Sequence, residues 1–288
     1  MASEPPGELR LHLGAHKTAT THLQRVLHKH RAALRAAGID FVRPVELRPA
    51  LAAARPALPL PWGEGALLMR VLDGLRTGAP VLVLSEENLV GSIPALFEPR
   101  PYPRVARRVR ALAAEAGTAP VTLFLAIRSF DRLWPSAHSQ WLRHNPHDPG
   151  RIDRARHIAR SAPPSWAEVV GRQHRAVPGA TVRVWRYEDH AEHWRAIAAA
   201  LVGADTGPIR DVPRPKGTVS PSAEAVRLAE AYAGPDRGTE VPAIYAAHPA
   251  EGGTPYAPFA ADEVAALQAR YAADLAALRA DGLLLAFD

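Results

Sequence analysis

The stretch "LHLGAHKTATTHLQ", residues 11–24, runs from an apolar segment through one glycine and one lysine into a cluster of threonines. A turn between the carboxyl end of a parallel strand and the start of a helix collects unpaired backbone N–H groups beside the positive end of the helix dipole. Here Gly14 permits a tight turn, the threonines add hydroxyl donors, and Lys17 adds a full positive charge. The stretch therefore predicts a loop that binds a phosphate or a sulfate.

Short apolar runs alternate with longer helical patterns on either side of this loop, which is typical of the crossover units that build a parallel sheet. Strands are expected at residues 9–13, 39–42, 81–85, 121–127 and 182–187. Helices are expected at residues 20–37, 104–116, 191–201 and 261–280, with a further helix that Ser220 caps and Pro221 begins. The proline-rich residues 44–65 show little periodicity and are expected to form an irregular connection.

These patterns predict an α/β fold, a three-layer sandwich in which helices flank a central, mainly parallel sheet. The 288 residues, 47% of them hydrophobic, suffice for a single domain over residues 1–288. Residues 1–8 are expected to form a flexible tail, and residues 203–288 a mainly helical C-terminal part. No feature of the sequence indicates the oligomeric state.

Composition excludes several classes of protein. The absence of cysteine removes disulfides, thiolate nucleophiles and cysteine-ligated zinc. The net charge of +6 favours anionic ligands, but the basic residues are scattered singly along the helices, which argues against nucleic-acid binding. The N-terminus lacks a basic segment followed by an apolar run, and the longest apolar runs are too short to span a bilayer, so we expect a cytoplasmic protein without a transmembrane segment.

Lysine is rare in this chain: only three of its 35 basic residues are lysines, at positions 17, 29 and 216. Lys29 fits an ordinary polar helix face. At Lys17 and Lys216, the local sequence suggests that a compact ammonium is needed where a planar guanidinium would not fit.

The opening loop differs from the phosphate-binding loop of nucleotide triphosphatases. That pattern needs a glycine immediately before the lysine and another five positions earlier. This chain has neither glycine: His16 precedes Lys17, and Leu11 stands five positions before His16.

The segment "GAHKTATTHLQ" instead resembles the 5′-phosphosulfate-binding loop of sulfotransferases that use 3′-phosphoadenosine 5′-phosphosulfate (PAPS), especially bacterial members with the form "GxHKTxTTxLQ". The resemblance implies that Lys17 contacts the oxygen that bridges the 5′-phosphate and the sulfuryl group. It also implies that the 5′-phosphate is wrapped by the loop from Gly14 through Thr18, Ala19, Thr20 and Thr21. Many relatives have glycine in place of Ala19, which we expect to lie in the first helical turn.

Two further segments resemble the same family. Arg128 ends an apolar strand and Ser136 follows eight residues later, as in the family's 3′-phosphate site; the alternative is an arginine paired with Asp131 and a serine packed within a helix. Lys216 and Gly217 match a lysine-glycine loop that closes over the 3′-phosphate and the adenine.

Transfer to an acceptor needs a base near the phosphosulfate loop, and "VLVLSEENL" supplies two acids at a strand end. Because strand side chains alternate between faces, only one of them should point into the site. By resemblance Glu87 is the better candidate and Glu86 the second; the alternative is that both are solvated. His16 is a candidate to contact the sulfuryl oxygens, and His138 to face the acceptor.

The resemblance implies transfer of a sulfuryl group from PAPS to a hydroxyl or an amine of a small-molecule or glycan acceptor, with 3′-phosphoadenosine 5′-phosphate (PAP) as the product. It implies no metal ion. The histidines of "HNPHD", residues 144–148, have a spacing that matches no metal-ligand pattern. Two alternatives stay open: a Mg²⁺-dependent phosphotransferase, favoured by the acids after residues 81–85, and a non-catalytic protein that binds adenosine bisphosphate.

Overall fold

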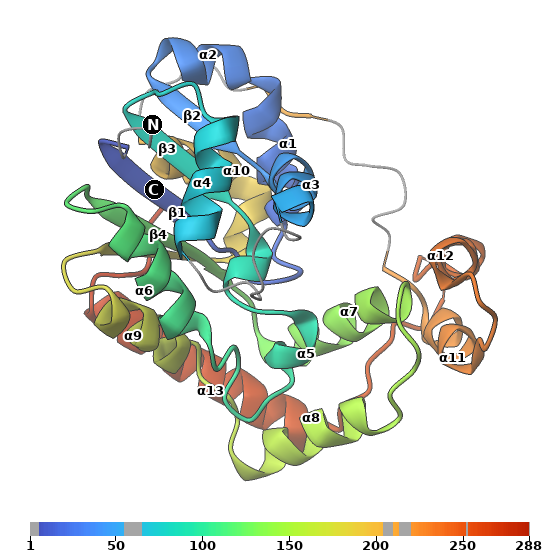
Figure 1. Cartoon of the computed structure of the whole chain (residues 1–288). Helices are drawn as coiled ribbons and strands as arrows, with labels where there is room; N and C mark the ends of the chain where they lie inside the picture. The colour runs from blue at the N-terminus through green and yellow to red at the C-terminus, as the bar shows by residue number, and fades with distance from the viewer. Residues whose placement is uncertain (1–5, 55–64, 204–209, 213–219, 252, 288) are drawn as a thin grey trace.

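The computed structural model describes residues 6–54, 65–203, 210–212, 220–251 and 253–287 (Figure 1). Its five strands form one parallel sheet in the order β2-β3-β1-β4-β5. The strands are β1 (Glu8–His12), β2 (Ile39–Val42), β3 (Val81–Ser85), β4 (Val121–Ile127) and β5 (Thr181–Arg186). The fold is thus the α/β sandwich that the alternating pattern predicts.

Thirteen α-helices lie in the described part of the chain, and none of them is both long and apolar enough to traverse a bilayer. The helices are α1 (Thr20–Lys29), α2 (Arg31–Ala36), α3 (Pro44–Ala54), α4 (Gly65–Leu75), α5 (Ile93–Leu96), α6 (Val105–Glu115), α7 (Phe130–Leu142), α8 (Gly150–Ser161), α9 (Trp166–Ala176), α10 (His190–Val202), α11 (Ala223–Ala231), α12 (Arg237–Ala247) and α13 (Ala261–Ala280).

Helices cover both faces of the sheet (Figure 1), because the strands carry apolar side chains on both faces. Side chains alternate along β4: Leu123 and Leu125 pack into one core, and Phe124 and Ala126 pack into the other. The first core is shared with α4, α6, α9 and α13, and the second with α1 and α10. This double burial fixes the strand register and leaves the strand ends as the place for polar groups.

The first helix ends earlier than expected. Instead of one helix over residues 20–37, α1 and α2 are separated at His30, whose backbone has φ −97° and ψ 14°. Nε2 of His30 accepts a hydrogen bond from the backbone N–H of Arg210 at 3.0 Å, so this residue serves a tertiary contact. Gly38 follows with φ 76°, the left-handed conformation that ends a helix.

The proline-rich connection is helical where it is described. Residues 44–54 form α3, although residues 44–65 were expected to be irregular. Pro44 stands at the first position, where the missing N–H costs nothing, and Pro49 interrupts only one hydrogen bond. Leu47 and Leu51 bury one side of α3 in the core, which outweighs that loss.

Two boundaries also differ from expectation. Glu8 already belongs to β1, and its backbone N–H donates to the carbonyl of Pro80, so the expected tail enters the sheet at its end. The expected cap Ser220 and helix start Pro221 lie before α11, because Pro221 pairs with Pro249 in a bridge. Ser222 caps the helix instead, accepting from the Ala225 N–H at 3.2 Å.

Helices α11 and α12 form a pair that stands to one side of the sheet beyond α7 (Figure 1); we call this pair the arm. The arm has a small core of its own, completed by Leu142 of α7. Arg237 is buried and donates to the carbonyls of Leu142 at 3.0 Å, Ala229 at 2.6 Å and Tyr232. One guanidinium therefore holds α11, α12 and the end of α7 together.

Replacing Arg237 by alanine should loosen the arm, because three buried carbonyls lose their donor. We expect a loss of at least about 2 kcal/mol of stability within the arm, seen as faster amide hydrogen exchange in α11 and α12. Arg227→Ala, which removes an exposed arginine of α11, is the matched control and should change stability by no more than about 0.5 kcal/mol. Equal exchange rates in the two variants would contradict this role of Arg237.

Candidate active site

The site is built where β1 and β4 end side by side. The two strands pair in parallel, with Leu9 opposite Val121 and His12 opposite Phe124, so the loops that follow them emerge at the same edge. β1 is also the strand at which the connections change direction, and such switch points form crevices at the carboxyl edge of an α/β sheet. Nη1 of Arg128, just after β4, donates to the carbonyl of Lys17 at 3.1 Å.

The loop after β1 is held in an uncommon backbone conformation. Gly14, Lys17 and Ala19 have φ values of 51°, 64° and 63°, in the left-handed region. A side chain at Gly14 would place its Cβ 2.4 Å from Cγ2 of Thr20, so only glycine fits there. Ala19 was expected in the first helical turn, but it is the left-handed residue before α1, where its methyl group costs about 1–2 kcal/mol.

The ammonium of Lys17 lies among positive charges. Burial, followed by Arg143 and then Arg128, lowers the pKa of Lys17 to about 8. Among the described residues, the ammonium has no carboxylate or hydrogen-bond partner. A partly buried cation that is left unpaired, with two guanidinium groups nearby, makes this a place for an anion.

Arg128 is positioned by its backbone and by an aromatic ring. Its carbonyl accepts from Nε1 of Trp166 at 2.8 Å, and its guanidinium carbon lies 4.2 Å from the ring centroid of Tyr187. Burial lowers the pKa of Arg128, with smaller effects from its neighbours. Asp131, the partner considered as an alternative, instead hydrogen-bonds to Ser129 and accepts from Gln268 at 3.2 Å.

Two adjoining cavities open at this edge. The larger, which we call the loop chamber, has a volume of about 410 Å³, and its walls come from the carboxyl ends of β1, β3, β4 and β5. The smaller, the arm chamber, has a volume of about 260 Å³ and lies between α7 and the arm. Both chambers are lined by Lys17, Arg128, Ser136, Gln140 and Ser220, so one elongated ligand can extend from one into the other.

The threonines of the loop have two different positions. Thr20 and Thr21, together with Ala19, line the loop chamber. The Thr18 hydroxyl is fully buried, donates to the Ala15 carbonyl at 2.6 Å and accepts from the Ala15 N–H at 3.3 Å. Thr18 therefore stabilises the turn from within.

The two acids after β3 have different surroundings. The Glu86 side chain is fully buried and accepts two hydrogen bonds from Arg48, at 2.7 and 2.8 Å, and one from the Asn88 N–H at 2.8 Å. Burial raises the pKa of Glu86. The Glu87 side chain is 20% exposed and lines the loop chamber.

Glu87 is held by two partners. Its Oε1 lies 3.0 Å from Nη2 of Arg48, and its Oε2 accepts from Nε2 of Gln24 at 3.2 Å. Burial acts to raise the pKa of Glu87, but Arg48 and the hydrogen bonds outweigh it, so the pKa lies below its usual value. Glu87 is thus ionised at neutral pH, and part of its side chain is exposed to the chamber.

His16 lines the same chamber but both of its ring nitrogens are engaged. Nδ1 lies 3.0 Å from the hydroxyl of Tyr102, and Nε2 lies 3.2 Å from Oδ1 of Asn88. Burial is the main cause of its lowered pKa. His16 is therefore a neutral hydrogen-bonding residue at physiological pH.

Sequence reasoning missed the residues that orient Glu87. Arg48 lies on α3, in the segment expected to be irregular, and Gln24 is the last residue of the quoted motif. Gln24 also donates to Oγ of Ser85 at 3.1 Å, and Ser85 lies 2.7 Å from Nδ1 of His12. Only the spacing of Gln24, one helical turn after Thr20 on α1, could have indicated that it faces the strand ends.

The remaining candidates are Lys216, Gly217 and His138. Lys216 and Gly217 fall outside the described residues. His138 was expected to face the acceptor, but it is fully buried and its Nε2 lies 2.8 Å from Glu230 of the arm, because α7 turns that side chain away from both chambers.

No protein-family model and no curated protein matches this chain. Among solved structures, the chain is similar to a sulfotransferase from Alicyclobacillus acidocaldarius. The two are 18% identical, the match covers 95% of this chain and 98% of the other, and the TM-score is 0.45. A similarity of this size does not extend to the chemistry of the site, which depends on the residues described above.

Ala19→Gly should maintain or slightly raise thermal stability, because glycine removes the penalty of the left-handed conformation. Ala273→Gly, at an exposed position within α13, is the matched control and should cost about 0.5–1 kcal/mol. Thermal and urea denaturation would compare the two variants. Equal destabilisation would show that position 19 is ordinary helix.

Proposed function

We propose that this protein is a sulfotransferase that takes a sulfuryl group from PAPS and transfers it to a hydroxyl or an amine of a small-molecule or glycan acceptor. The observation that supports this most strongly is the meeting of Lys17 and Arg128, 111 residues apart in sequence, in the wall of one chamber. The segment around each of them resembles one of the two phosphate-binding sites of PAPS-dependent enzymes. A donor with a phosphate on both its 5′ and 3′ oxygens requires two such sites together.

Electrostatics favour a ligand with more than one negative charge. Lys17 and Arg128 are both partly buried, and Arg143 adds a third positive charge to the walls of the arm chamber. Their mutual repulsion is relieved when phosphate or sulfate groups lie between them. Glu87 lies at the β3 side of the loop chamber. The anion is therefore placed at the opposite side, where the Glu87 carboxylate does not repel it.

In this proposal the 5′-phosphosulfate lies against the loop from Gly14 to Ala19, with backbone N–H groups, Lys17 and the first residues of α1 around it. Such groups bind anions at helix N-termini. The 3′-phosphate lies near Arg128 and Ser136, which line both chambers. Lys216 and Gly217 are proposed to complete that end of the donor site.

The proposed reaction is one in-line displacement at sulfur. A bond forms between the acceptor oxygen or nitrogen and sulfur while the bond from sulfur to the 5′-phosphate oxygen breaks, and PAP leaves. Lys17 neutralises the charge that grows on that leaving oxygen, and the acceptor proton passes to Glu87. The positive charges come from side chains, so the scheme needs no metal ion.

A Mg²⁺-dependent phosphotransferase is the main rival, and two contacts weigh against it. Such enzymes hold Mg²⁺ through the hydroxyl after the loop lysine and an acid at a neighbouring strand end. The corresponding hydroxyl, that of Thr18, donates a hydrogen bond to the Ala15 carbonyl, and the Glu86 carboxylate accepts hydrogen bonds from Arg48. Both groups would have to leave their partners before they could bind a metal ion.

Binding of PAP tests the proposed function directly. PAP should raise the melting temperature in the presence of EDTA, because a ligand that binds only the folded state stabilises it. Lys17→Ala should abolish both this shift and sulfuryl transfer from labelled PAPS, while the protein remains folded by circular dichroism. Stabilisation by ATP with Mg²⁺ but not by PAP would favour the phosphotransferase. PAP binding without transfer to any acceptor would favour a non-catalytic binding protein.

The pKa of Lys17 predicts how PAP binding depends on pH. Burial lowers this pKa to about 8, and bound phosphate raises it, so binding takes up a proton and affinity falls as the pH rises through about 8. The phosphates of PAP are fully ionised above about pH 7 and do not titrate in this range. Isothermal titration should show this fall in affinity. A flat wild-type profile would contradict the assignment.

Glu87→Gln should lower turnover by about 10²–10⁴-fold, the usual contribution of a general base. PAP affinity should hardly change, because Glu87 serves the acceptor. Glu86→Gln is the neighbouring control: it should lower stability, since Arg48 loses a charged partner, and have a smaller effect on turnover of the folded protein. A loss of turnover confined to Glu86→Gln would reverse the two roles.

A further inference from the structure

Three side chains that can bind metal ions meet where the arm joins α7. They are His138 on α7, His147 on the loop between α7 and α8, and Glu230 on α11. Nε2 of His138 lies 2.8 Å from Oε1 of Glu230, and Nδ1 of His147 lies 3.8 Å from the same oxygen. One ligand atom from each residue lies within 4.8 Å of the other two.

We propose that His138, His147 and Glu230 bind a zinc ion that fastens the arm to the body of the protein. Two imidazoles and one carboxylate form a donor set that suits Zn²⁺ better than Mg²⁺ or Ca²⁺, which prefer oxygen. Tetrahedral zinc with bonds of about 2.0–2.2 Å separates its ligand atoms by about 3.3–3.5 Å. The distances of 2.8 and 3.8 Å lie on either side of that value, so small side-chain movements would suffice.

The cluster contains a polar atom that protein contacts leave unused. Nδ1 of His147 is buried and has no hydrogen-bond partner among the described residues, although it lies beside the Glu230 carboxylate. A buried ring nitrogen that lacks a hydrogen-bond partner and lies beside a carboxylate is available to bind a metal ion.

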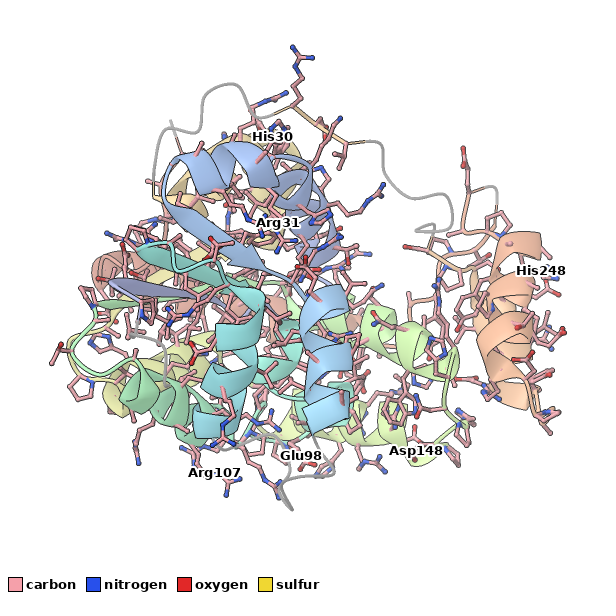
Figure 2. All side chains as sticks on the ribbon, turned by 45° about the horizontal axis from the view of Figure 1, so that its top comes forward. His30, Arg31, Glu98, Arg107, Asp148 and His248 are labelled. Atoms are coloured by element: carbon pink, nitrogen blue, oxygen red, sulfur yellow. The ribbon has the colours of Figure 1, made fainter. Side chains whose placement is uncertain are left out.

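The position of the cluster gives the ion a structural role. The arm is otherwise attached to α7 near its C-terminal end, where Arg237 donates to the Leu142 carbonyl at 3.0 Å and the Tyr245 hydroxyl donates to the Ser139 carbonyl at 2.8 Å. Figure 2 shows Asp148, which follows His147, on the side of the body that faces the arm carrying His248. A zinc ion here would join α11 both to α7 and to the loop after it.

The ion would also stiffen a wall of the arm chamber. The ring of Tyr256, which lines this chamber, stacks on His138 with centroids 6.0 Å apart and an interplanar angle of 24°. None of the three proposed ligands lines either chamber. The proposed zinc site is therefore separate from the transfer chemistry, and it stands whether or not the protein is a sulfotransferase.

The sequence supplies a matched control. His144 and His147 belong to the same run, "HNPHD", but only His147 belongs to the cluster, and His144 is exposed. Binding by the cluster should therefore distinguish the two histidines. Binding by a histidine-rich surface loop should not.

The test is zinc titration of the untagged full-length chain after treatment with EDTA, in competition with a chromophoric chelator. We expect one zinc ion per chain. His147→Ala and Glu230→Gln should each weaken binding by at least about tenfold, since loss of a ligand should cost no less than loss of an outer-shell partner. His144→Ala should leave binding unchanged, and circular dichroism would verify that each variant is folded.

Hydrogen exchange provides a second measurement. Zinc should slow amide exchange in α11 and in the loop around His147 in the wild type and in His144→Ala, but not in His147→Ala. Absence of saturable binding would overturn the proposal. So would equal weakening by His144→Ala and His147→Ala, or protection by zinc that leaves α11 unchanged.

Discussion

The hydrogen bond from Arg128 to the carbonyl of Lys17 is the contact on which the candidate site depends, because it joins the ends of two adjacent strands. The contact also holds two positively charged residues close together at a partly buried position. An isolated loop would not keep like charges together in this way. The pairing of β1 with β4 and the two apolar cores around the sheet hold the charges there. Burial, together with the charges of Arg143 and Arg128, lowers the pKa of Lys17, and the proposed anion would relieve this repulsion.

The sheet could be predicted from the sequence because its strands are nearly continuous apolar runs separated by longer helical patterns. The loop between β1 and α1 was also recognisable, since glycine, lysine and threonines follow one of these runs. The helix break at His30 was not predictable, because it depends on a contact with Arg210, which is remote in sequence. Residues 44–54 were misjudged because local proline content indicates a loop, whereas burial of Leu47 and Leu51 stabilises a helix.

The candidate site, like the fold, could be predicted from the sequence only in part. Strand alternation could separate Glu86 from Glu87, but only the tertiary structure shows that Arg48 binds both carboxylates and that Gln24 holds one of them. The conformation of Ala19 was hidden for another reason: alanine is a strong helix former, and local preference gives no indication of a left-handed turn. The histidine spacing of "HNPHD" is uninformative because the neighbours of His147 come from α7 and α11.

The two chambers share five lining residues, but the rest of their walls come from different parts of the chain. The groups around the loop chamber come from strand ends that the buried cores hold in place, whereas one wall of the arm chamber comes from Tyr245, Ala250, Pro255, Tyr256 and Ala257, at the end of α12 and after it. Substitutions in this wall can therefore accumulate over evolution without disturbing Lys17, Arg128 or the sheet beneath them. Proteins that share this architecture can therefore vary in what the arm chamber recognises while the residues of the loop chamber stay the same.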